Sequence, residues 1–141
     1  MQIIERKCLN EVDPIVVVDD SMVDLTITKR VYERSELKNP LLTFTNGYAF
    51  LDYMLSTATG EVPVPAMVLM DINMPELNGF DTIAKLRDRA EFSEIPVIVM
   101  LTNSDSNQDA EKAFEVGANG FQTKDFNIDR YTAFFNSLKA S

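Results

Sequence analysis

Acidic, hydroxyl and ammonium side chains follow four of the five apolar runs of this sequence, at or near the point where each run ends. Asp19 and Asp20 follow the first run, Asp71 the third and Thr102 the fourth, while Lys124 lies just beyond the fifth. Three carboxylates in one cleft repel one another and raise their pKa values unless a cation lies between them. The chain has no histidine and a single cysteine, so an oxygen-binding magnesium ion fits this set better than zinc.

Phosphoryl transfer is the chemistry that such a set supports. Asp71 is the best candidate nucleophile because it follows the third, central run, and carboxylates serve as covalent phosphoryl acceptors. Magnesium and Lys124 would neutralise charge, while the Thr102 hydroxyl could donate a hydrogen bond to a phosphoryl oxygen. The sequence Asn73-Met74-Pro75 predicts a tight turn whose carbonyls could add a metal ligand.

Short apolar runs alternate with amphipathic stretches after Pro14. Runs rich in β-branched residues, without polar alternation, are typical of strands buried on both faces. The predicted strands cover residues 15–18, 41–44, 66–70, 97–101 and about 120–123. Five strands that alternate with five helices predict an α/β fold, a parallel sheet with helices on both faces. A doubly wound sheet of this kind places its ligand site outside the carboxyl ends of its strands, where the polar residues above lie.

The helices are predicted from spacing and from turn residues. Val23, Ile27 and Val31 recur every four residues and indicate the apolar side of the first helix, with Ser21 and Asp24 as its capping pair. The dipeptide Asn46-Gly47 predicts a turn, and the proline-containing segment 59–65 predicts a loop. Apolar residues at helical spacing mark the other four helices: Phe50, Tyr53 and Met54; Phe80, Ile83, Ala84 and Leu86; Ala110, Ala113 and Phe114; Ile128, Tyr131, Phe135 and Leu138.

Composition limits the classes of partner. The net charge of -9 over 141 residues argues against nucleic acid or an anionic membrane as the main partner, because both require a basic surface. Cys8 is the one cysteine, which excludes an internal disulfide and indicates a cytoplasmic setting. No apolar run approaches the roughly 20 residues that span a bilayer. Residues 1–13 are predicted to be an N-terminal extension, and residues 14–141 the domain.

Four ordered motifs resemble the response-regulator receiver domain. They are Val17-Val18-Asp19-Asp20-Ser21, Leu69-Met70-Asp71-Ile72-Asn73-Met74-Pro75 with Asn78-Gly79, Pro96-Val97-Ile98-Val99-Met100-Leu101-Thr102, and Gly117-Ala118-Asn119-Gly120-Phe121-Gln122-Thr123-Lys124. The resemblance runs from about Pro14 to the last helix. It implies a flavodoxin-like, doubly wound five-stranded parallel sheet with strand order 2-1-3-4-5.

The resemblance also implies a role for each site residue. Asp71 is then the phosphoacceptor, supplied by a sensor histidine kinase or a histidine phosphotransfer protein. Asp19, Asp20, Asp71 and the Asn73 carbonyl form the Mg²⁺ site, and Lys124 is the ion partner of the phosphoryl group.

The remaining roles concern switching and its rate. Thr102 is the hydroxyl that moves to the phosphoryl group, and Phe121 is the aromatic residue that turns inward on activation. A buried aromatic residue in a short strand is also often simple core, and this alternative stays open for Phe121. Asn73 and Ser104 occupy the positions that tune the dephosphorylation rate.

Two residues depart from the usual receiver pattern. Asn103 follows the switch threonine, where a small residue is usual, and its larger side chain is expected to narrow access to the phosphoryl group. Asp125 follows Lys124, where proline is usual and often forms a cis bond. Because a non-proline cis bond costs about 3 kcal/mol, we expect a trans bond at Lys124–Asp125 and a reshaped loop.

A narrower resemblance points to the single-domain regulators paired with bacterial phytochrome kinases. It rests on Leu101-Thr102-Asn103-Ser104, on the Pro63–Pro65 loop and on the short stretch after Leu138, which has no room for an output domain. The signal would then pass by protein–protein contact through the last two helices and the fifth strand. The target would be another protein, a second copy in a homodimer, or the next carrier of a phosphorelay.

The predicted function is a phosphorylation switch of a two-component system, in which Mg²⁺-dependent self-phosphorylation and autodephosphorylation are the only reactions. One alternative is a phosphatase that forms an aspartyl-phosphate, but such enzymes usually carry a second acid where this chain has Asn73. The other is a degenerate receiver that acts as a phosphorylation-independent interaction module. The presence of all acceptor residues counts against it, while Asn103 and Asp125 count for it.

Overall fold

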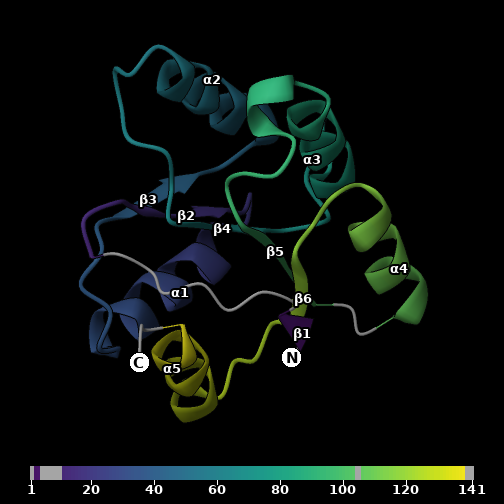
Figure 1. Cartoon of the computed structure of the whole chain (residues 1–141). Helices are drawn as coiled ribbons and strands as arrows, with labels where there is room; N and C mark the ends of the chain where they lie inside the picture. Colours follow the sequence, from purple (N-terminus) through teal and green to yellow (C-terminus); the bar gives the residue numbers. More distant parts are fainter. Residues whose placement is uncertain (1, 4–10, 104–105, 139–141) are drawn as a thin grey trace.

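The structure is a computed structural model, and it describes residues 2–3, 11–103 and 106–138 (Figure 1). The strands are β1 (Gln2–Ile3), β2 (Ile15–Val18), β3 (Leu41–Phe44), β4 (Met67–Met70), β5 (Ile98–Thr102) and β6 (Gly120–Thr123). The helices are α1 (Met22–Arg34), α2 (Gly47–Ala58), α3 (Gly79–Arg87), α4 (Asn107–Glu115) and α5 (Ile128–Ser137), with a 3₁₀ turn η1 (Ala90–Phe92).

The strands form one sheet in the order β1-β6-β5-β4-β2-β3. The strands β2 to β6 are parallel, which confirms the predicted order 2-1-3-4-5. The strand β1 was not predicted. It pairs antiparallel with β6, Gln2 opposite Phe121 and Ile3 opposite Gly120, so part of the predicted N-terminal extension adds to the sheet edge.

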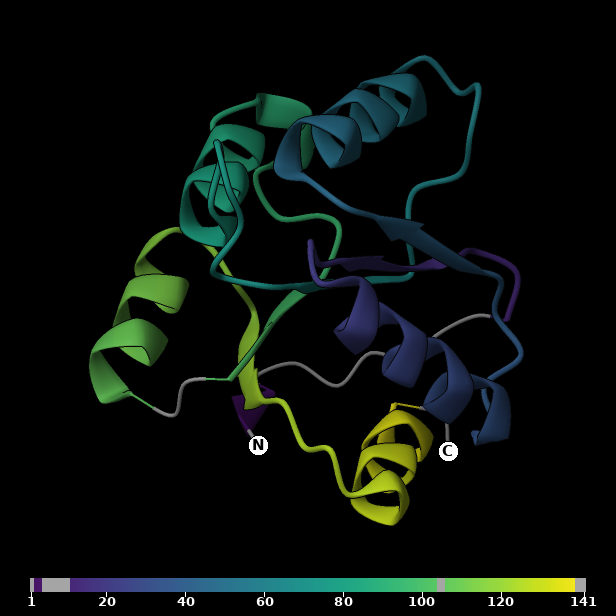
Figure 2. The same ribbon diagram turned by 180° about the vertical axis from the view of Figure 1, so that it is seen from behind.

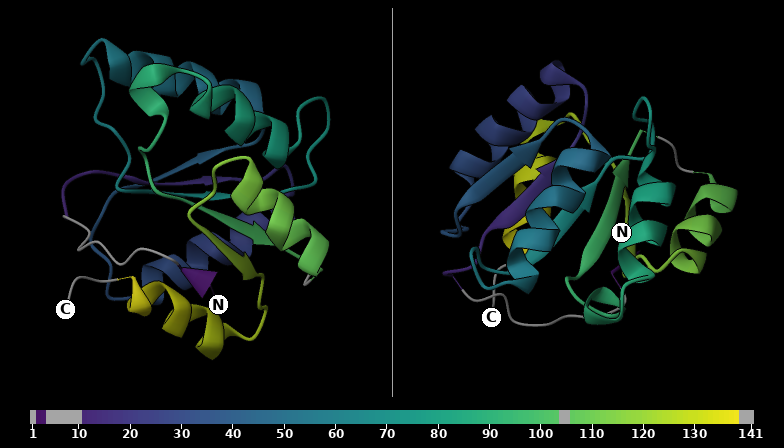
Figure 3. Two further views of the ribbon diagram at one scale, coloured as in Figure 1. Left: turned by 45° about the vertical axis from the view of Figure 1, so that its right-hand side comes forward. Right: turned by 90° about the horizontal axis from the view of Figure 1, so that it is seen from above.

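Helices cover both faces of the sheet, as predicted. Figures 1 and 3 show α1 and α5 on one face and α2, α3 and α4 on the other, and Figure 2 shows α1 beside α5 from behind. The side chains of each buried strand alternate between two cores. Val16, Val68 and Met100 pack beneath α2, α3 and α4, whereas Val17 and Leu69 pack against α1 and α5. Continuous apolar runs are therefore needed because both faces of each central strand are covered.

The buried side of α1 differs from the predicted one. Val23 is 70% exposed, so the prediction that it lies on the apolar side with Ile27 and Val31 was wrong. The buried residues of α1 are Leu25, Thr28, Val31 and Tyr32. A strict four-residue spacing drifts around a helix of 3.6 residues per turn, and one polar residue, Thr28, belongs to the buried side because it has a hydrogen-bond partner there.

Each α-helix begins after a serine or asparagine whose side chain accepts a hydrogen bond from a backbone amide of the first turn. Ser21 accepts from the amide of Asp24, as predicted, but the amide of Ser21 donates to Asp19 at 2.9 Å, so the capping pair is formed in one direction. Asn46 accepts from the amide of Ala49, so Asn46-Gly47 begins α2 and is not a separate turn. These caps fix where each loop at the carboxyl edge of the sheet turns into its helix.

Three further predictions concern single positions or the whole chain. Among the described residues, the cis peptide bond lies at Ile95–Pro96, and Lys124–Asp125 is trans as expected. Cys8 and Ser104 lie outside the described residues. In the part of the chain that the structure describes, no helix combines the length and the apolar character needed to cross a membrane.

Candidate functional site

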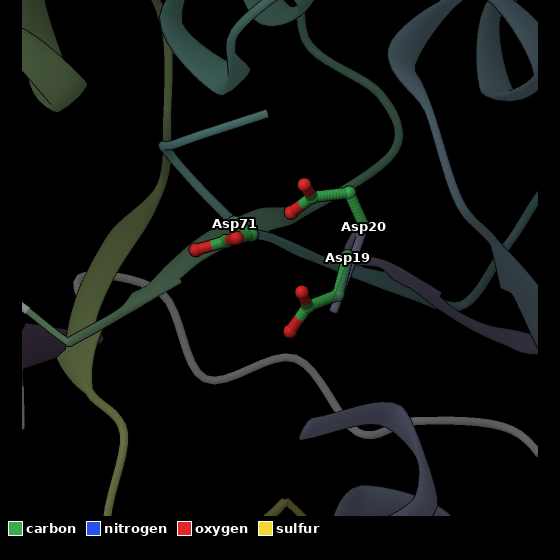
Figure 4. A group of neighbouring side chains, drawn as sticks. All are labelled: Asp19, Asp20 and Asp71. Atoms are coloured by element: carbon green, nitrogen blue, oxygen red, sulfur yellow. The ribbon is translucent and has the colours of Figure 1, made fainter. Parts of the chain in front are cut away.

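Three carboxylates from two strand ends meet at the carboxyl edge of the sheet. Asp19 and Asp20 follow β2, and Asp71 follows β4. One carboxylate oxygen of each residue lies within 4.8 Å of the others, and Figure 4 shows the three side chains converging on one space. Asp19 and Asp71 are buried, whereas Asp20 is exposed. The predicted acidic cluster is therefore present.

Sheet pairing brings these residues together. The strand β2 lies between β3 and β4, with Val18 opposite both Phe44 and Met70. The amide of Asp19 donates to the carbonyl of Phe44 at 3.0 Å, and the amide of Asp71 donates to the carbonyl of Val18 at 2.9 Å. The backbone of both acids is thus held by the continuing ladder, and their positions follow from strand register.

Gly79 allows the helix α3 to begin very close to the acid at the end of β4. A Cβ atom at Gly79 would meet the backbone carbonyl oxygen of Asp71 well inside contact distance. The amide of Gly79 also donates to the carbonyl of Ile72 at 2.8 Å. The loop after Asp71 is therefore closed against the first turn of α3, and a residue without a side chain is required there.

Lys124 lies beside the acidic cluster, as predicted, and is almost completely buried. Its ammonium donates to Asp19 at 2.6 Å and to Asp24 at 2.8 Å, and lies 3.6 Å from an Asp71 oxygen. Burial alone would lower the pKa of Lys124, but the bonds to Asp19 and Asp24 raise it above its ordinary value. Lys124 therefore stays charged and supplies the positive side of the site.

The environment of Asp71 opposes its ionisation. Burial raises the pKa of the Asp71 carboxyl to about 7, and Lys124 and the 3.0 Å hydrogen bond from the Ile72 amide offset this only in part. The carboxylates of Asp19 and Asp20 also act to raise the pKa and contribute to that value. Lys124 alone does not compensate the negative charge of the acidic cluster. A second cation next to Asp71 would favour the ionised form of its carboxyl group.

Thr102 and Phe121 lie on neighbouring strands, β5 and β6. Thr102 ends β5 and is fully buried. The amide of Lys124 donates to the Thr102 carbonyl at 2.6 Å, which fixes the two residues side by side. The ring of Phe121 on β6 is 7% exposed and packs with the core beneath α2, α3 and α4. In this structure the ring thus already points inward.

Two of the positions predicted to affect the dephosphorylation rate lie at the surface. Asn73 and Asn103 are both exposed, on the loops that follow β4 and β5. Ser104 lies outside the described residues. At the site of the missing proline, Asp125 forms an ion pair with Arg130 at 2.6 Å and accepts a 2.9 Å hydrogen bond from the Asn127 amide. These bonds lower the pKa of Asp125 and tie the loop after Lys124 to the start of α5.

Asp24 is the site residue that sequence reasoning missed. It was interpreted as the partner of Ser21 in a helix cap; its amide does donate to Ser21, but its side chain bonds Lys124. The available signal was its place in the first turn of the helix that directly follows Asp19 and Asp20, because that turn lies over the same edge of the sheet. The helix dipole also favours an acid in this turn. The presence of Asp24 could therefore be explained by the helix start alone, without a partner such as Lys124.

The donor set fits a hard divalent cation. Carboxylate and carbonyl oxygens are the ligands that magnesium prefers, and magnesium usually takes one or two carboxylates while keeping several waters. Asp19, Asp20 and Asp71 each offer one carboxylate oxygen, and these oxygens lie within 4.8 Å of one another, close enough to bind one ion. Lys124 compensates one negative charge of the cluster, which leaves an excess that a divalent ion would balance.

Known proteins resemble this chain over most of its length. A family model described as the response regulator receiver domain matches residues 15–136. Response regulator Rcp1 from Synechocystis sp. is 28% identical over 115 residues, which cover 81% of this chain and 78% of that protein. Two-component response regulator 24 from Arabidopsis thaliana is 31% identical over 124 residues, which cover 87% and 81%.

Solved structures show the same fold. Response regulator RPA3017, described as acting in red light signalling of R. palustris, is 29% identical with a TM-score of 0.80, covering 89% of this chain and 90% of that one. The bacteriophytochrome response regulator RtBRR is 31% identical with a TM-score of 0.74, covering 90% and 78%. The Mn²⁺-bound form of Rcp1 matches with a TM-score of 0.73 at 24% identity, covering 89% and 91%.

Proposed function

Because this chain belongs to the response regulator receiver domain family, the signalling domains of two-component systems, we propose that Asp71 is its phosphoacceptor. The phosphoryl group would come from a phosphohistidine of a sensor histidine kinase or of a histidine phosphotransfer protein. The observation that carries this proposal is the convergence of Asp19, Asp20 and Asp71 beside the buried ammonium of Lys124.

The transfer is a substitution at phosphorus. An Asp71 oxygen forms the new P–O bond while the P–N bond to the donor imidazole breaks, and the imidazole leaves with the bonding electron pair and takes up a proton. The attacking carboxyl must be ionised, and burial disfavours that form by raising its pKa to about 7. Lys124, 3.6 Å from Asp71, favours the ionised form and lies where charge on the phosphoryl oxygens needs compensation.

Receiver domains bind a divalent metal, and we assign Mg²⁺ to this chain. Asp19, Asp20, the Asp71 carboxylate and the Asn73 carbonyl are the proposed ligands, and the first three offer oxygens close enough to share one ion. The metal would neutralise charge on the carboxylates and the phosphoryl oxygens. The relative Rcp1 has a structure described as its Mn²⁺-bound form, which supports a bound dication here.

Signalling would follow from a shift between two shapes of the domain. We assign the switch to Thr102, whose hydroxyl would bond a phosphoryl oxygen, and to Phe121 on the next strand. Since the Phe121 ring is already buried, activation would need a repacking of this ring and not simply its entry into the core. Asn73, Asn103 and Ser104 are assigned to the rate at which the phosphoryl group is lost.

The partners are proposed from the same relatives. Several matching proteins are described as phytochrome response regulators, among them RtBRR and AtBRR, and we propose a phytochrome-linked histidine kinase as the donor. The readout would be contact with a downstream protein or a second copy through α4, β6 and α5. A cytoplasmic setting follows for a partner of a kinase's histidine domain.

Labelling with acetyl phosphate and Mg²⁺ tests the acceptor. Intact-mass measurement should show one added phosphoryl group on the wild-type chain, none on Asp71→Asn, and wild-type labelling of Asp129→Asn, an exposed acid in the first turn of α5. Equal labelling of wild type and Asp71→Asn would reject the assignment. Signalling by Asp71→Asn at the wild-type level in a reconstituted kinase assay would instead support the phosphorylation-independent module.

A further inference from the structure

The ammonium of Lys124 is shared between the acidic cluster and the helix α1. It bonds Asp19 at 2.6 Å and Asp24 at 2.8 Å, and both contacts are short, charge-assisted hydrogen bonds. The side chain of Lys124 is 2% exposed and that of Asp24 is 17% exposed. The contact with Asp24 is therefore largely shielded from water. An ion pair in such a position is stronger than one at an open surface.

These two bonds determine where the ammonium points. A lysine ammonium has three N–H donors, and two of them are directed to Asp19 and Asp24. The distance of 3.6 Å to Asp71 is too long for a hydrogen bond. Lys124 is thus hydrogen-bonded on the side of the site next to α1, and its contact with Asp71 is the longer, 3.6 Å ion pair.

Asp24 differs from the other acids of the site because a helix carries it. Asp19, Asp20 and Asp71 follow strands, whereas Asp24 lies in the first turn of α1, with its amide bonded to Ser21. One turn further along, the Thr28 hydroxyl bonds the Tyr131 hydroxyl of α5 at 2.8 Å. The buried side of α1 is thereby tied to α5, one turn from the residue that bonds Lys124.

We propose that Asp24 is a positioning residue that competes with the phosphoryl group for the ammonium of Lys124. This inference rests on the proposed function. In the unphosphorylated protein Asp24 keeps Lys124 at α1. When a phosphoryl group on Asp71 attracts Lys124, the bond to Asp24 is lost or stretched, so the strength of that bond opposes occupation of Asp71 and couples the site to α1.

The variant Asp24→Asn removes the charge and keeps the size of the side chain. Asp81→Asn is the matched control, because Asp81 has the same place in the first turn of α3, with its amide capped by Asn78, and is exposed. Asp24→Glu keeps the charge and serves as the second variant. Any general effect of weakening a helix start should appear equally in the Asp81 control.

The experiment is a titration with beryllofluoride, a phosphoryl mimic that binds an aspartate together with a dication, at saturating Mg²⁺. Asp24→Asn should bind it about three- to tenfold more tightly than wild type, the factor that a partly shielded ion pair supports, while Asp81→Asn should match wild type. Asp24→Glu should lie closer to wild type than Asp24→Asn does. A structural role alone would weaken binding, so equal or weaker binding by a folded Asp24→Asn protein overturns the proposal.

Two further measurements test this proposal and the assignment of Asp71 as phosphoacceptor separately. The nitrogen resonance of the Lys124 ammonium, observed by lysine-selective NMR without any phosphoryl mimic, should shift in Asp24→Asn and stay in place in Asp81→Asn. An unshifted resonance would show that Asp24 does not hold Lys124, whatever Asp71 does. If wild type itself fails to be labelled by acetyl phosphate, it is the proposed function that fails.

Discussion

The backbone amide of Lys124 donates a 2.6 Å hydrogen bond to the backbone carbonyl of Thr102. It continues the pairing of β5 with β6, in which Thr102 lies opposite Thr123. Two residues assigned to phosphoryl binding are therefore joined through their main chains as well as lying in one site. A displacement of the Thr102 backbone would pass directly to Lys124, and this gives the hydroxyl and the ammonium a common path of movement.

Thr102→Val is expected to separate labelling from switching. Valine has the shape of threonine without the hydroxyl, and the backbone bond to Lys124 does not depend on the side chain. Acetyl phosphate should therefore still label Asp71, but the conformational change that follows should be reduced at least about threefold, because one donor to the phosphoryl group is missing. Amide chemical shifts of β5, β6 and α4, with and without beryllofluoride, measure that change.

Thr102→Ser is the control for the hydroxyl itself. It keeps the donor and loses one methyl group from a fully buried position, which should lower the free energy of unfolding by about 1 kcal/mol. Its beryllofluoride-induced shifts should match those of wild type. A full response in the valine variant would mean that the hydroxyl of Thr102 does not take part in switching.

The ionisation of Asp71 should make stability depend on pH and on metal. Its folded-state pKa of about 7 lies above the ordinary aspartate value, because burial favours the protonated form. The stability that this group contributes is therefore fully present below about pH 4 and is lost as pH rises through 7. We expect the melting temperature of the metal-free protein, relative to that of Asp71→Asn, to fall between pH 5.5 and 8.

Magnesium should reverse that loss, since a cation beside Asp71 favours the carboxylate. The rise in melting temperature on adding Mg²⁺ should be larger at pH 8 than at pH 5.5, and it should be much smaller in Asp71→Asn at both values. Thermal denaturation followed by circular dichroism gives all four numbers. A Mg²⁺ effect of equal size at the two pH values would contradict the raised pKa.

Gly79→Ala should damage the site more than its effect on overall stability implies. The added Cβ would collide with the carbonyl of Asp71, so the loop after β4 must move, at a cost of about 1 to 3 kcal/mol. Ala84→Gly, in the exposed part of the same helix, costs about 1 kcal/mol through helix propensity alone. The rate of labelling by acetyl phosphate should fall in Gly79→Ala and stay normal in Ala84→Gly.

The strands of the sheet and the strand-borne site residues could be predicted because they depend on the same local signal. A continuous apolar run such as Ile15–Val18 marks a strand covered on both faces, and the polar residue that ends it must lie at the carboxyl edge. Asp19, Asp71 and Lys124 lie where strand direction alone predicts them, without any knowledge of side-chain contacts.

The helix-borne parts were less predictable. Whether Val23 or Leu25 faces the sheet depends on the exact start of α1 and on the position of α5, and neither is encoded in a four-residue spacing. Asp24 was missed for the same reason, since its partner Lys124 lies 100 residues away in sequence. The strand β1 has only two residues, and its pairing with β6 depends on an edge that exists only after folding.

The buried hydroxyl pair between α1 and α5 should contribute to the stability of the domain. The hydroxyls of Thr28 and Tyr131 are 2.8 Å apart and both side chains are almost completely buried. Thr28→Val or Tyr131→Phe leaves one polar group without its partner, so each should lower the free energy of unfolding by about 1 to 3 kcal/mol. The double variant removes both groups and should lose clearly less than the sum, which urea denaturation of the four proteins measures. An additive double variant would mean that the two hydroxyls do not interact.

The same pair of hydroxyls should also affect how the free energy of unfolding depends on pH above pH 9. Burial raises the pKa of Tyr131 to about 12, although its bond to Thr28 lowers it in part. Because the folded-state pKa exceeds the ordinary value of about 10, the stability linked to this proton is fully present below pH 10 and is lost as pH rises through 12. The wild type should therefore lose on the order of 2 kcal/mol more than Tyr131→Phe between pH 9 and 12. Equal losses in the two proteins would show that the Tyr131 hydroxyl ionises as freely in the folded domain as in water.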